Sequence, residues 1–158
     1  MKLKIILLLT VIVLVSCSGQ HKAVDSKMAI LNNKEDFSWV VGGDHELWAP
    51  DIYEFERLDL VLEKAIHDGE FKFMKVPTLK RLKKSYRQYI CYVDDNGDKL
   101  VYINSFCEMY SSYIDDKHRE FDWKNKILYI SDGGPCYWHV TINVTKGSYS
   151  HVVTNGYG

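Results

Sequence analysis

The dipeptide Asn96-Gly97 is the feature that most constrains how this chain folds. It lies between two segments, residues 86–93 and 99–107, that are rich in aromatic and β-branched residues with a period of two. Asn-Gly is the strongest short signal for a β-hairpin, because both central positions of a type I′ turn need positive φ. The sequence therefore predicts an antiparallel pair of strands joined at this point.

A two-residue loop at Asn96-Gly97 fixes which side chains share a face. It sets Cys91 opposite Tyr102, and it places Arg87 and Asn104 on one face and Cys107 on the other. Neither face is purely polar, so we expect this hairpin to be covered on both sides. A Cys91–Cys107 disulfide is excluded in this register, because the two side chains point away from each other.

A helix is expected before the hairpin, at about residues 52–67. Asp51 and Glu54 form a capping-box pattern, and Asp68-Gly69 is a stop signal. Leu58 and Leu62 belong to a set of apolar residues at helical spacing, so we expect both to be buried against a sheet. Residues 71–84 are ambiguous: they either contain a short basic helix from Thr78 to Lys84 or lead directly into a strand.

The C-terminal third predicts further strands. Residues 126–131 form one strand, residues 136–145 alternate clearly, and residues 148–155 return after the Lys146-Gly147 turn. One face of the second strand carries Cys136, Trp138, Val140, Ile142 and Val144. The expected fold class is α+β, with one main N-terminal helix packed on a twisted antiparallel meander sheet of about five strands, in a cystatin-like or NTF2-like layout.

The N-terminus resembles a bacterial lipoprotein signal. Met1–Lys4 carries two lysines, and residues 5–15 are apolar except for Thr10. Leu14-Val15-Ser16-Cys17 is similar to a lipobox. The resemblance implies a signal peptide at 1–16 and a lipidated Cys17 at the start of the mature protein.

The expected organisation is a signal peptide at 1–16, a lipid anchor and flexible tether at 17–35, and a single α+β domain at 36–158. Residues 28–31 interrupt the polar tether and could form a first helical turn. Ser18 after the lipidated cysteine implies, by the sorting pattern of lipoproteins, an anchor in the outer membrane. The domain would then face the periplasm.

Charge is unevenly distributed. Residues 35–70 are strongly acidic, whereas residues 71–93 contain seven basic residues and no acid. The basic segment could meet anionic lipid headgroups or could be an ordinary solvated face partly neutralised by the acidic helix, and the sequence favours the second interpretation. Removing the signal peptide with its two lysines leaves 18 basic and 21 acidic residues, a net charge of about −3, which argues against nucleic acid as a partner.

The sequence contains no phosphate-binding loop, no metal-binding histidine motif and no Cys-x-x-Cys, so we expect no cofactor and no metal. With Cys17 lipidated, Cys91, Cys107 and Cys136 remain, and one intramolecular disulfide is the maximum. If a bridge forms it involves Cys136, and Cys107 is the favoured partner. A cysteine-dependent hydrolase acting through Cys136 is a minor alternative.

Residues 86–156 resemble small exported bacterial proteins of unassigned function. The resemblance is carried by Tyr86–Tyr89, Asn104–Cys107, Asp132–Trp138 and Asn155-Gly156. It implies a shared architecture and no particular activity. A polar cluster at the strand ends is a possible site, formed by Arg87, Asn104, Asp132 and Asn155, although structural hydrogen bonding is the favoured role for these residues.

The sequence thus predicts a membrane-anchored periplasmic lipoprotein with a non-enzymatic binding or interaction domain. Its partner, a periplasmic protein or a small ligand, is not specified by any motif. An enzyme inhibitor or immunity-type protein is the main alternative. Thr145-Lys146-Gly147 resembles the end of a motif in membrane-bound lysozyme inhibitors, but Thr141 stands where those proteins have tyrosine.

Overall fold

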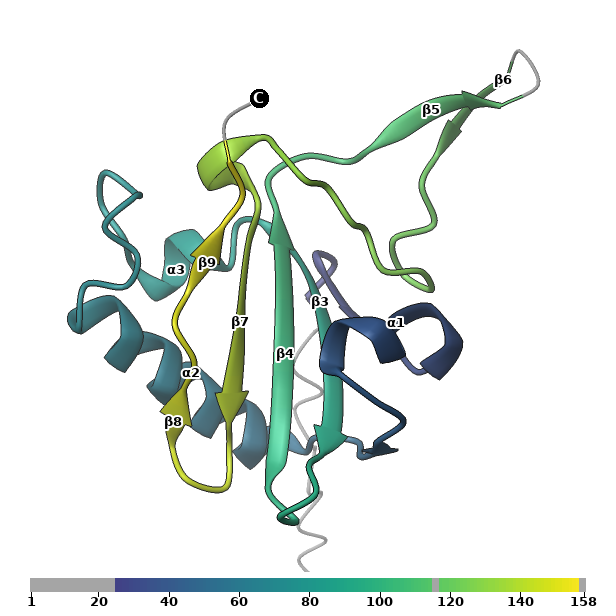
Figure 1. Ribbon diagram of the computed structural model, residues 1–158. Helices are drawn as coiled ribbons and strands as arrows, with labels where there is room; N and C mark the ends of the chain where they lie inside the picture. The colour runs from purple at the N-terminus through teal and green to yellow at the C-terminus, as the bar shows by residue number, and fades with distance from the viewer. Residues whose placement is uncertain (1–24, 115–116, 157–158) are drawn as a thin grey trace, which may run out of the picture.

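A computed structural model of the chain describes residues 25–114 and 117–156 (Figure 1). Cys17 and the lipobox lie outside the described residues. The elements in chain order are β1 (Met28–Ile30), α1 (Lys34–Val41), β2 (Glu46–Leu47), α2 (Ile52–His67), α3 (Leu79–Leu82), β3 (Tyr86–Val93), β4 (Lys99–Phe106), β5 (Ser111–Ile114), β6 (Lys117–Glu120), a 3₁₀ turn (Gly134–Cys136), β7 (Trp138–Asn143), β8 (Ser148–Tyr149) and β9 (Val153–Thr154).

The expected α+β class is confirmed, but the sheet is mixed rather than a five-stranded antiparallel meander. Its order is β1-β3-β4-β7-β8, with β2 on one end of β3 and β9 on β7. β1 runs parallel to β3, and the other pairs are antiparallel. The β5–β6 ribbon projects from the body of the domain (Figure 1).

α2 is the helix that the sequence predicted, and it begins and ends as expected. The Asp51 carboxylate accepts the N–H of Glu54, the Glu54 carboxylate accepts the N–H of Asp51, and Gly69 has φ of 85°. Leu58 and Leu62 are each only 2% exposed, and they pack on the sheet together with α3. No helix within the described ranges is both long and apolar enough to cross a bilayer.

The hairpin lies at the predicted place, but its register differs by one residue. Cys91 faces Val101 rather than Tyr102. The N–H of Asp94 donates to the carbonyl of Asp98 over 3.0 Å, so the loop is one residue longer than a type I′ turn, and Gly97 has φ of 80°. The Asp94 carboxylate stabilises this wider loop by accepting the N–H groups of Asn96 and Asp98, each over 2.9 Å.

Relative to β3, this shift of one residue moves every side chain of β4 to the face opposite the predicted one, because side chains alternate with a period of two. Cys91, Val101 and Ile103 therefore share the face that α2 covers. Gln88 and Asn104 share the opposite face, which is covered in part by α1 and by residues 121–131. The prediction that the hairpin is covered on both sides is confirmed.

Three other segments differ from expectation. Met28–Ile30 is a strand beside β3 rather than a helical turn, and α1 begins at Lys34, so the folded part includes residues that the sequence assigned to the tether. Residues 127–130 are not a strand, and the 108–124 connection contains β5 and β6. In the last hairpin Ile142 faces Tyr149, not His151.

The C-terminal region keeps two expected features. Trp138, Val140, Ile142 and Val144 are buried on one face, as their alternation predicted. Cys107 and Cys136 form the favoured disulfide, with Cα atoms 5.1 Å apart, and Cys91 is a buried free thiol. The pairing is right although the register used to exclude Cys91–Cys107 is wrong.

Leu62→Ala should lower the free energy of unfolding by roughly 2–5 kcal/mol, because it leaves a cavity under α2. Leu60 lies on the same helix and is 65% exposed, so Leu60→Ala is the matched control and should change stability little. Urea unfolding of both variants measures the difference. Equal stability losses would contradict the packing described for α2.

Candidate functional site

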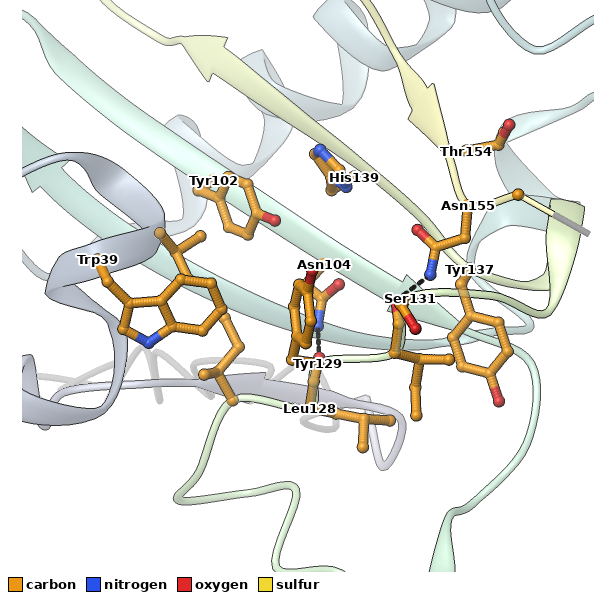
Figure 2. Close-up of a pocket in the computed structure, with 14 residues that line it drawn as sticks. Trp39, Tyr102, Asn104, Leu128, Tyr129, Ser131, Tyr137, His139, Thr154 and Asn155 are labelled. Carbon is orange, nitrogen blue, oxygen red and sulfur yellow. Dashed lines mark hydrogen bonds between the residues drawn. The ribbon is translucent and has the colours of Figure 1, made fainter. Parts of the chain in front are cut away.

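The sheet face opposite α2 carries a groove with a volume of about 440 Å³ (Figure 2). Its floor comes from β4, β7 and β9, one wall comes from α1, and the other wall comes from the segment 127–131. The side chains that converge on it in Figure 2 belong to elements far apart in the sequence. Its principal lining residues are Trp39, Tyr102, Asn104, Tyr129, Ser131, Tyr137, His139, Thr154 and Asn155.

The groove wall formed by residues 127–131 is held in place by the side chain of Gln88. This amide on β3 is fully buried. Its Nε2 donates to the carbonyls of Trp123 (2.6 Å) and Lys126 (2.7 Å), and its Oε1 accepts the N–H of Leu128 (2.9 Å). Because residues 127–130 form no ladder with the sheet, Gln88 satisfies backbone groups that a neighbouring strand would otherwise satisfy.

Two asparagines continue this arrangement along the wall. Asn104 Nδ2 donates to the Oε1 of Gln88 (2.9 Å) and to the carbonyl of Leu128 (2.7 Å). Asn155 Nδ2 donates to the carbonyls of Ile130 and Asp132, the second over 3.2 Å. The groove wall is therefore fixed by side-chain amides at both ends.

Two aromatic side chains flank the mouth of the groove. Trp39 on α1 and Tyr129 on the opposite wall meet edge to face, with ring centroids 5.3 Å apart. They are 59% and 68% exposed, respectively, which is unusual for aromatic rings of this size. Exposed aromatic side chains beside a concave surface are a common feature of binding sites.

The groove is electrically neutral at physiological pH. Among the described residues that line it, none is Asp, Glu, Lys or Arg. Burial, together with the nearby Tyr129, raises the pKa of Tyr102 to about 12, so its phenol stays protonated. Burial lowers the pKa of His139 below its ordinary value, which favours the neutral imidazole. The Tyr102 and His139 rings lie 5.6 Å apart on the floor.

The predicted polar cluster is only partly assembled. Asn104 and Asn155 both line the groove, and Asp132 joins through its backbone carbonyl while its side chain is exposed. Arg87 lies on the other face of the sheet, where its Nη2 bonds to the carboxylate of Asp25. The predicted register had placed Arg87 on the same face as Asn104, with Tyr89 opposite Asn104, whereas in the structure Gln88 faces Asn104 and Arg87 lies on the other face.

Sequence reasoning missed Gln88, Trp39, Tyr129 and His139 as site residues. Trp39 and Tyr129 come from segments without a motif, so no signal in the sequence joins them. Gln88 had one available signal, since an amide amid the apolar residues of a predicted covered strand needs a specific set of hydrogen-bond partners.

The chemistry of Cys136 is constrained by its partner. It is bonded to Cys107, so it is not a free nucleophile, and the alternative of a hydrolase acting through it has no support. Within the described part of the chain, no three His, Cys, Asp or Glu side chains gather in a group able to hold a metal ion.

Comparisons of the chain with protein-family models, with curated proteins and with solved structures found no match.

Gln88→Leu should lower the free energy of unfolding by about 3 kcal/mol or more, because several buried backbone groups and the Asn104 amide lose a partner at ~1–3 kcal/mol each. Hydrogen exchange at the Leu128 amide should accelerate in parallel. Asn125→Ala is the control, because Asn125 is an exposed amide shortly before the wall, and its side chain bonds to no described residue other than Asp122. Unchanged exchange at Leu128 would show that Gln88 does not hold the wall.

Proposed function

We propose that this protein is a lipoprotein of the bacterial outer membrane, anchored through Cys17, whose periplasmic α+β domain binds an uncharged ligand. The observation that carries the binding role is the groove itself. It combines two exposed aromatic rings with a floor and walls that hold no charged side chain among the described residues. Support for the anchor comes from the lipobox resemblance of Leu14–Cys17.

The lining favours a ligand with flat apolar faces and several hydroxyl or amide groups, such as a neutral saccharide. Trp39 and Tyr129 offer aromatic faces and edges, on which an apolar ring face can pack. The hydroxyls of Ser131, Tyr137 and Thr154 make no hydrogen bond to another described residue, so they are free to bond to a ligand. A charged ligand would lose its hydration here without gaining a partner.

The alternative of an enzyme inhibitor has less support. Thr145 Oγ1 accepts the N–H of Lys99 over 2.9 Å, and Lys146 pairs with the carboxylate of Asp98. These residues therefore close the end of the sheet. The cystatin-like or NTF2-like layout remains part of the proposal, supported by one long helix packed on a largely antiparallel sheet.

Neutral oligosaccharides should shift the NMR signal of the Trp39 indole N–H, because this ring borders the groove. The Trp48 indole N–H is an internal reference, since it bonds to the carbonyls of Tyr92 and Leu100 outside the groove. Trp39→Ala and Tyr129→Ala should each weaken binding about tenfold or more.

The control variant is Tyr53→Ala, which removes a ring that is 71% exposed on α2. It should leave the affinity unchanged. If none of the neutral oligosaccharides shifts the NMR signal of the Trp39 indole N–H, the groove is not the binding site for this class of ligand. The same conclusion follows if Tyr53→Ala weakens binding as much as Trp39→Ala.

Cys17→Ser should move the protein out of the membrane fraction or leave it as unprocessed precursor, because the thiol that receives the lipid is gone. Mass spectrometry of the parent chain should find acyl mass on Cys17. The control is Cys91→Ser, which retains the lipobox. Unchanged fractionation of Cys17→Ser with no acyl mass on the parent chain would refute the anchor.

A further inference from the structure

A second surface, which shares no lining residue with the groove, gathers four basic residues of the 71–93 segment. Val76, Lys80, Arg81 and Lys84 border one shallow depression, and Lys75 borders a second one together with Arg81 and Lys84. We call these five residues the basic surface. All of them are exposed, and Val76 places an apolar side chain, 57% exposed, among four cations.

The basic surface makes no direct ion pair with the described residues of the acidic helix. Within the described part of the chain, none of its four cations forms an ion pair with a carboxylate. The neighbouring Lys83 does reach α2, where it pairs with Asp59. The helix thus compensates Lys83 directly, whereas the four cations of the basic surface make no direct ion pair with it.

The N-terminal segment enters the fold beside this surface. Lys27 Nζ donates to the carbonyl of Lys84 over 2.8 Å, and the N–H of Arg87 donates to the carbonyl of Lys27 over 2.8 Å. The buried guanidinium of Arg87 also pairs with Asp25. These contacts fix residues 25–27 next to Lys84, which gives Arg87 a positioning role.

The length of chain from this point to Cys17 limits how far the anchor can lie from the basic surface. The eight Cα-to-Cα steps from Cys17 to Asp25 span at most about 26–29 Å when fully extended. If Cys17 carries lipid, as proposed above, the bilayer surface lies within about that distance of Asp25, and Lys27, two residues further on, contacts Lys84. Basic residues close to an anionic bilayer are attracted to it over about one Debye length.

We infer that the basic surface docks on an anionic phospholipid bilayer and orients the anchored domain. Cations from Lys75 to Lys84 would meet the phosphates of the headgroups, and Val76 would enter the interfacial region. α3, which carries Lys80 and Arg81, packs with α2 on the face of the sheet opposite the groove. Docking through this surface would therefore leave the groove open to the periplasm. The inference rests on the proposed anchor for its distance argument alone.

The test uses the full chain in vesicles with a fluorophore on Val76→Cys and a lipid whose headgroup carries a nitroxide quencher. Cys91 is buried, which raises the pKa of its thiol to about 12, and Cys107 and Cys136 are bonded to each other. The parent chain treated with the same dye reports any reaction at Cys17. Dye on Cys17 would refute the proposed anchor. The signal of the dye-treated parent chain would then be subtracted from that of the labelled Val76→Cys variant, which leaves the quenching at position 76.

Quenching should be several-fold stronger in vesicles of phosphatidylcholine mixed with phosphatidylglycerol than in phosphatidylcholine alone. The triple variant Lys80→Gln, Arg81→Gln, Lys84→Gln should shift the docking equilibrium on the order of a hundredfold, and quenching should fall to the level of neutral vesicles. A fluorophore on Tyr129→Cys, at the groove, should be quenched weakly in both kinds of vesicle.

The matched control removes the same charges elsewhere, through Arg57→Gln, Lys124→Gln and Lys126→Gln. These three side chains are also exposed and form no ion pair with a described residue, and this variant should dock like the parent chain. Circular dichroism should show that both triple variants are folded. Equal quenching in the two kinds of vesicle, or equal losses in the two triple variants, would overturn the inference.

Discussion

The side chain of Gln88 is the interaction on which the groove face of this protein depends. A buried amide is costly unless each of its donors and acceptors is paired. Here the amide is paired with the backbone of Trp123, Lys126 and Leu128 and with Asn104. The segment after β6 is therefore held over the face of the sheet without becoming a strand.

The groove exists because this wall is not a strand. A regular strand at residues 127–130 would have continued a sheet, whereas the amide-held segment stands over the floor formed by Tyr102 and His139. It also presents Tyr129 to Trp39 across the opening. The same bonds that satisfy the buried backbone thus decide the shape of the site, and the uncharged lining decides which ligands it can accept.

The two faces of the sheet divide the proposed roles. The face under α2 contains the continuous apolar core, and the short basic helix and Arg87 lie at its margin. Arg87 has its guanidinium buried and paired with Asp25, which ties the N-terminal segment to the sheet beside Lys84. The opposite face holds the neutral groove. A membrane-facing surface and a ligand-facing surface can therefore coexist in one small domain.

Local chemistry in the sequence determined α2, the buried face of β7 and the position of the hairpin, because caps, periodicity and turn residues act over a few neighbouring positions. The register of the hairpin was decided by the Asp94 carboxylate, which bonds to two backbone N–H groups and widens the loop by one residue. That step put Gln88 instead of Tyr89 opposite Asn104 and removed Arg87 from the face of Asn104, since a shift of one residue moves a side chain to the other face. Pairing of Met28–Ile30 with β3, and the meeting of Trp39 with Tyr129, join segments distant in sequence. Only the tertiary structure could decide those contacts, because no local preference of either segment specifies its partner.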